Sequence, residues 1–113
     1  MKISNDNINK LIIDSVRPDQ LQNLEELMSR YGSKQAFYKK AYIGECLFSH
    51  GTQKVTYLKS YDTIVACIWQ NQLRIYGWFS QTTARHIREF AKQNGFFDEI
   101  TKQDMLNKSV FSK

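Results

Sequence analysis

The feature that most constrains the fold is a run of four short segments joined by very short links. Each segment is rich in aromatic and β-branched side chains, as strands are; they cover residues 42–49, 54–60, 63–69 and 72–79. Links of two to four residues leave no room for the crossover that parallel strands need, so neighbouring strands must run antiparallel. The sequence therefore predicts a four-stranded antiparallel meander over residues 42–79.

The third and fourth segments predict which side chains share a face of this sheet. If residues 70–71 form a two-residue turn, Trp69 pairs with Gln72, and alternation then assigns each side chain to a face. One face holds Val65, Cys67, Trp69, Arg74, Tyr76 and Trp78. The other holds Ile64, Ala66, Ile68, Leu73 and Ile75.

An amphipathic helix is predicted directly after the meander, over residues 80–95. Ser80 is a good N-cap, and Gly95 supplies the left-handed residue that ends many helices. Apolar residues and the ring of His86 fall on one side of this helix, and a basic stripe lies opposite: Arg85, Arg88 and Lys92. We expect the apolar side to pack on the face that contains Ile64, Ile68 and Ile75.

The remaining segments complete a single α+β domain. Residues 1–17 suit a short helix or an arm packed on the body, and residues 96–113 suit a tail or a short helix. Pro18 fits a first helical position, and apolar residues at helical spacing then predict a helix over 18–31: Leu21, Leu24, Leu27, Met28 and Tyr31. Ser33 can cap a second short helix to about Ala41, so residues 18–41 are expected to be helical.

Positive charge is concentrated in the meander and the helix after it. Residues 54–94 contain six Lys or Arg and two Asp or Glu, so they carry +4 of the formal +5 of the chain. A basic domain favours a polyanionic partner such as DNA or RNA, although the same charge also promotes solubility.

Two groups of side chains are candidate binding residues. The helix stripe of Arg85, Arg88 and Lys92 can meet phosphates or an acidic protein patch, or it can be a solvated face. On the sheet, aromatic rings next to a cation suit a stacking platform for single strands or a protein hot spot: Arg74, Tyr76 and Trp78, beside Trp69. That platform exists only if the helix predicted over 18–31 leaves the face open.

Patterns for catalysis and for metal binding are missing. His50 falls in a turn, and His86 is expected to be a hydrogen-bonded structural residue. Cys46 and Cys67 have no CxxC partners, and the glycines form no phosphate-binding motif. We therefore predict a non-enzymatic protein without cofactor or metal. With no apolar run of membrane-spanning length and no secretory leader, a cytoplasmic location is expected.

Three stretches carry a resemblance to a known group of proteins. The segments YLKSYDTIVA (57–66), WFSQTTARHIREF (78–90) and QNGF (93–96) resemble a family of small proteins from phages and plasmids of Gram-positive bacteria. Its motif is an SYxTxVA strand and a YSxTTxxHIxxF helix start, with Phe79 here in place of Tyr, and the similarity covers residues 32–97. The family has no established activity, so the resemblance implies an accessory protein of a mobile element. Small proteins of this origin include anti-CRISPR inhibitors, which usually occupy a nuclease surface without catalysis.

These observations leave two functions open. The first is a non-enzymatic inhibitor of a host defence nuclease such as Cas9, acting in the host bacterial cell. The second is a small basic DNA- or RNA-binding regulator. A homodimer closed by exposed apolar surface is also left open. For either function, changing Arg85 and Arg88 to Glu is expected to abolish binding without unfolding, because both side chains are predicted to lie in solvent.

Overall fold

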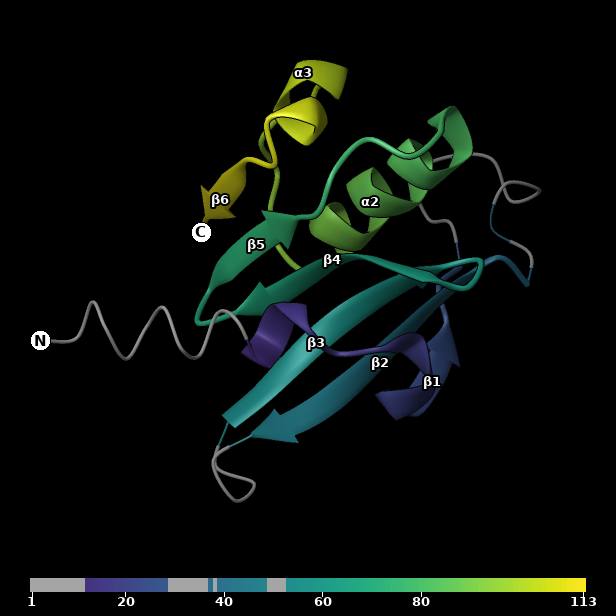
Figure 1. Cartoon of the computed structure of the whole chain (residues 1–113). Coiled ribbons are helices and arrows are strands. Elements are labelled where there is room, and N and C mark those ends of the chain that lie inside the picture. The colour runs from purple at the N-terminus through teal and green to yellow at the C-terminus, as the bar shows by residue number, and fades with distance from the viewer. Residues whose placement is uncertain (1–11, 29–36, 38, 49–52) are drawn as a thin grey trace, which may run out of the picture.

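A six-stranded antiparallel sheet, with its strands side by side in chain order, forms the body of the protein (Figure 1). The structure is a computed structural model that describes residues 12–28, 37, 39–48 and 53–113. The strands are β1 (Gln22–Glu26), β2 (Ala41–Phe48), β3 (Gln53–Ser60), β4 (Thr63–Trp69), β5 (Gln72–Ile75) and β6 (Val110–Ser112). The helices are η1 (Pro18–Gln20), α2 (Gln81–Gln93) and α3 (Lys102–Leu106). The α+β class is confirmed, with six strands in place of four.

The predicted meander corresponds to β2–β5. Trp69 pairs with Gln72 and Cys67 with Arg74, as the two-residue turn requires. Residues 70 and 71 both have positive φ, 53° and 61°, which is the conformation of the type I′ hairpin turn. The fourth strand is shorter than predicted, because β5 ends at Ile75.

The helix predicted over residues 18–31 is wrong. Pro18 does begin a helix, but it is a 3-10 turn of three residues, after which the chain enters β1. Leu21 and Leu27, which flank this strand, reach opposite sides of the sheet, and both are buried. Pairing with β2 also covers an open strand edge, and these long-range gains outweigh a weak local preference for helix.

The other terminal predictions have mixed outcomes. The helix predicted from Ser33 lies mostly outside the described residues, and Ala41, its expected end, begins β2 instead. Residues 96–113, expected to be a tail or a short helix, contain α3 and then β6, which pairs with β5. The strand was missed because three residues carry too little alternation to detect.

A β-bulge at Val65 divides β4 into two parts. The consecutive residues Leu58 and Lys59 of β3 pair with Ala66 and Ile64, so Val65 has no partner in β3. An extra residue shifts the alternation of a strand by one, and Val65 therefore packs on the α2 side while Ile64 turns to the other side. The predicted faces of these two residues were wrong. The remainder of the predicted α2-facing set is confirmed on that side: Ala66, Ile68, Leu73 and Ile75.

Two apolar clusters lie on opposite sides of the sheet, one under α2 and one under the N-terminal residues (Figure 1). The larger includes Leu58, Leu73, Ile87 and Phe90. The smaller consists of Ile13, Leu21, Val55, Tyr57, Cys67 and Trp69, with partly buried neighbours. Both faces of the sheet are therefore covered, which explains why β4 is apolar on both sides.

The ends of α2 match the prediction from sequence. The Ser80 hydroxyl accepts a hydrogen bond from the Thr83 backbone N–H at 3.0 Å, and Gly95 has φ 88°. These local signals fix the first and last turns of the helix.

Candidate binding surface

The outer side of α2 carries the basic residues predicted from helical periodicity. Arg85 and Lys92 are exposed, as expected. Arg88 is half-buried, and its Nε donates a hydrogen bond to the Ile100 carbonyl at 2.8 Å. The expectation that Arg88 is solvated was therefore wrong, because its head group ties α2 to the loop that follows it.

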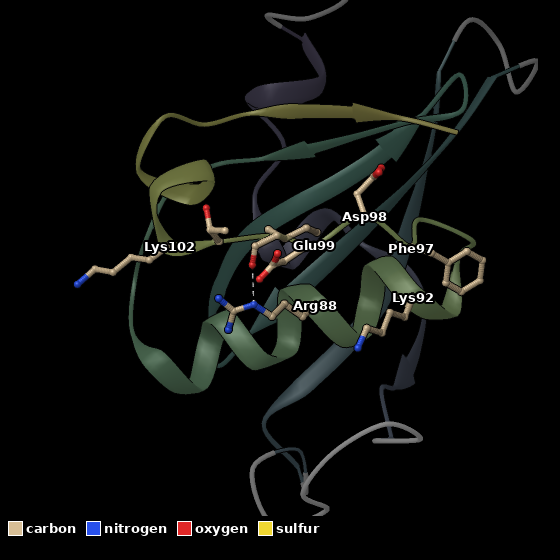
Figure 2. Close-up of a pocket in the computed structure, with 8 residues that line it drawn as sticks. Arg88, Lys92, Phe97, Asp98, Glu99 and Lys102 are labelled. Carbon is tan, nitrogen blue, oxygen red and sulfur yellow. Dashed lines mark hydrogen bonds between the residues drawn. The ribbon is translucent and has the colours of Figure 1, made fainter.

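A hollow of about 590 Å³ lies between α2 and this loop (Figure 2). Its lining residues are Arg88, Lys92, Phe97, Asp98, Glu99, Ile100, Thr101 and Lys102. Lys92 and Lys102 lie toward opposite ends of it, and the Phe97 ring lies beyond Lys92 (Figure 2). The hollow thus combines three cations, two carboxylates and an aromatic ring that is 74% exposed.

The loop presents these side chains because both of its ends are anchored. Phe96 and Ile100 are buried in the core under α2, which leaves the three residues between them exposed. At the far end Thr101 caps α3, and its hydroxyl accepts from the Asp104 N–H at 3.1 Å. Sequence reasoning missed this loop because it has neither a periodic pattern nor a known motif. The one available signal was the pair of acidic residues, Asp98 and Glu99, directly after a basic helix.

Trp78 does not lie with Arg74 and Tyr76, as the sequence had predicted. The strand has already ended at Ile75, and Gly77 has φ 151°, a value that favours glycine. Trp78 consequently packs on the α2 side, where the Lys102 ammonium lies 4.7 Å from its ring centroid. It is therefore linked to the hollow through Lys102.

Arg74 and Tyr76 face the opposite side of the sheet and meet the N-terminal residues. Arg74 Nη2 donates to Asp14 Oδ2 at 2.7 Å, and the Tyr76 hydroxyl donates to Asp14 Oδ1 at 2.9 Å. Burial lowers the pKa of Arg74, but the hydrogen bond and the charge of Asp14 outweigh that effect and raise the pKa above its ordinary value.

The sheet face predicted as a stacking platform is covered. Trp69 and Arg74 are each only 8% exposed. The cover is formed by residues 12–21, not by a helix over 18–31. Bases cannot stack on these rings while that segment is in place.

His86 is a hydrogen-bonded structural histidine, as predicted. Its side chain is fully buried, with Nδ1 2.7 Å from the Ser60 hydroxyl and the Phe37 ring centroid 4.8 Å away. Glu89, one turn further along α2, is buried as well, and its carboxylate accepts from Gln93 Nε2 at 2.6 Å. Its negative charge is therefore inside the fold and not on the basic surface.

The two thiols lie on the face opposite α2. Burial raises the pKa of both Cys46 and Cys67, so neither has the thiolate character of a reactive cysteine. His50 lies outside the described residues. Within the described part of the chain, no group of three or more His, Cys, Asp or Glu side chains could hold a metal ion. None of the helices described there is long and apolar enough to cross a membrane.

The fold and the surface define a small α+β domain with a meander sheet, two helices, α2 and α3, between its last two strands in sequence, and a basic outer side on α2. The model of DUF8033, a family of unknown function, matches residues 25–108, and the chain belongs to this family. The matched stretch includes β2–β5, α2 and the hollow, and it begins after residues 12–21. Neither a curated protein nor a solved structure matches the chain.

Proposed function

We propose that the chain is a non-enzymatic binding protein that docks on a partner protein through the outer side of α2 and the adjacent hollow. The observation that carries this proposal is the exposed Phe97 ring at a hollow lined by charges of both signs. Aromatic and arginine side chains dominate the energetics of protein interfaces, and polar groups form the rim around them. Arg85, Arg88 and Lys92 would supply the charge in such a contact.

The two carboxylates favour a protein partner over a nucleic acid. Asp98 and Glu99 line the same hollow as Arg88, Lys92 and Lys102. A groove that follows a phosphate backbone is generally positive along its length, because each carboxylate would repel a phosphate. Mixed charges suit a protein surface with complementary charges of its own.

The proposed partner is a host defence nuclease, with Cas9 as the candidate. This part rests on the resemblance to small proteins of phages and plasmids. An inhibitor of this kind occupies a surface of the nuclease and needs no catalytic residues. Within the bacterial cell it would bind the nuclease or its complex with guide RNA.

A second candidate function is binding to DNA or RNA without a protein partner. Arg85, Lys92 and Lys102 favour it, because all three are exposed cations and two of them, Lys92 and Lys102, line the same hollow. Binding of this kind would weaken steeply with salt, by roughly one released counterion per phosphate contact.

Binding assays separate the two functions. The purified protein is tested against a Cas9–guide complex and against short single- and double-stranded DNA and RNA, at about 50 and 200 mM salt. We expect binding to the nuclease complex and none to free nucleic acid. Tight, salt-sensitive binding to free nucleic acid would replace the inhibitor proposal with the second candidate.

A pair of matched variants then tests the surface itself. The combination Arg85→Glu with Lys92→Glu reverses two exposed charges on α2 and leaves the Arg88 contact with Ile100 intact. The control, Arg17→Glu with Lys54→Glu, makes the same change in net charge at exposed sites away from α2. Loss of binding in the α2 pair alone is the expected result. Equal binding by both pairs would remove α2 from the proposal.

A further inference from the structure

A second feature of the molecule lies on the sheet face opposite α2. Residues 12–21, here called the N-terminal strap, cross that face, with Ile13 and Leu21 buried in the smaller apolar cluster. The strap lies outside the stretch that matches the family. Its Asp14 carboxylate sits between Arg74 and Tyr76 and accepts a hydrogen bond from each.

Holding the strap does not require a buried charge at position 74. Apolar residues of the same volume are often as stabilising as a buried ion pair. The Asp14 side chain is 38% exposed and is bonded by Nη2 of Arg74, whereas Nη1 is buried and has no hydrogen-bond partner among the described residues. Nη1 of the guanidinium therefore remains as a donor for a carboxylate on this face, in addition to Nη2, which donates to Asp14.

The face also holds the main chain of the strap. The Tyr57 hydroxyl donates to the carbonyl of Ile13 at 2.8 Å, next to the carboxylate held by Arg74 and Tyr76. Tyr57 belongs to β3 and Arg74 to β5, so the donors are held by strands of the sheet. The residues that these donors bind belong to a helical turn, since residues 12–14 are helical. Donors on a rigid framework that bond both a backbone carbonyl and the next side chain are well suited to hold such a turn of a peptide.

We propose that this face is a binding site for an acidic peptide segment, and that the chain fills it with its own strap. The ligand pattern is an apolar residue, then Asp, then any residue, then an apolar residue, as in residues 13–16. The carboxylate would bind Arg74 and Tyr76, and the preceding carbonyl would bind Tyr57. A segment of a partner protein with this pattern competes with the strap. The site lies across the sheet from the α2 surface, so either proposal can fail without the other.

The test uses the full chain with Asp14→Asn, which keeps the shape of the strap but removes its charge. The probe is a fluorescein-labelled synthetic peptide of residues 12–21, IIDSVRPDQL, and the readout is fluorescence anisotropy. Because a weakened strap leaves the site open more often, we expect the variant to bind the peptide at least ~10-fold more tightly than the unaltered chain. Ile13→Ala loosens the strap through a different contact and leaves Arg74 and Tyr76 in place, so it should also raise the affinity. It provides the test if Asp14→Asn does not fold.

Two controls decide whether the carboxylate is recognised. The peptide carrying Asp14→Asn should bind neither variant, and adding Arg74→Met to either variant should abolish binding of the acidic peptide.

The proposal is overturned if both strap variants bind the peptide no better than the unaltered chain does. It is also overturned if the peptide carrying Asp14→Asn binds equally well. Dimers of the strap variants that the peptide does not disperse, seen by size-exclusion chromatography, would show a second copy as the occupant and would overturn the partner-peptide proposal.

Discussion

The hydroxyl of Ser60, the last residue of β3, lies 2.7 Å from Nδ1 of His86 in α2, and both side chains are buried. The same hydroxyl lies 2.9 Å from that of Thr83, one turn earlier in the helix. One serine thus connects the sheet to two turns of α2. Because α2 carries Arg85 and Lys92, this buried polar contact helps to set the position of the proposed binding surface.

Replacement of Ser60 by alanine should destabilise the protein. Ser60→Ala removes a partner from the buried His86 and Thr83, and unsatisfied buried polar groups cost about 1–3 kcal/mol. The measurement is the free energy of unfolding from urea denaturation. Gln81→Ala, at an exposed site in the first turn of α2, is the control, and its effect should stay within about 0.5 kcal/mol. Equal stabilities for the two variants would contradict a structural role for the contact.

Gly44→Ala should destabilise the junction between β1 and β2. A Cβ at this position would lie 2.9 Å from Leu21 Cβ and 2.9 Å from Leu24 Cδ2. Overpacking of this kind costs about 1–3 kcal/mol, measured again by urea denaturation. Adding Leu24→Ala should restore part of the loss, because it removes one of the two close atoms and leaves the other. A neutral Gly44→Ala would show that β1 packs less closely on β2.

Stability should fall as the pH rises above about 9. Burial is the main cause, and it raises the pKa of Cys67, Tyr57 and Tyr76 above their ordinary values. Their groups stay protonated in the folded state while the unfolded chain releases protons, so the unfolded state is favoured at high pH. The loss should approach about 1.4 kcal/mol per pH unit for each such group that is ionised in the unfolded chain.

The alkaline loss can be assigned by substitution. Cys67→Ala and Tyr76→Phe each remove one of these groups, and each should flatten the decline of the unfolding free energy between about pH 9 and 11. The ion pair of Arg74 with Asp14 should persist through this range, because the pKa of Arg74 is raised. A stability that stays constant to pH 11 in the unaltered chain would contradict the prediction.

Phe97→Ala should separate binding from stability. The ring is 74% exposed, so its removal should change the free energy of unfolding by less than about 0.5 kcal/mol. At a hot spot the same truncation should weaken binding to the partner by about 10-fold or more, measured by titration. Leu47→Ala, an exposed apolar residue of β2, is the control and should leave binding unchanged. Equal affinities for both variants would exclude Phe97 from the interface.

Much of the fold and part of the surface could be predicted because the signals are local. The turn at residues 70–71 sets the register of β4 on β5, and Ser80 and Gly95 mark the ends of α2. The exposure of Arg85 and Lys92 follows from helical periodicity alone. Each of these features depends on residues within a few positions of one another.

The sequence by itself therefore determined the meander, the helix after it and the basic side of that helix. Only the tertiary structure decided that residues 22–26 form a strand, because the edge of β2 competes with the local preference for helix. It also decided that Arg74 is paired with Asp14, 60 residues away, and that Arg88 bonds the carbonyl of Ile100. The physical reason is the same in all three cases: the partner that lowers the free energy lies 12 or more residues away in the chain and is brought near only by tertiary folding.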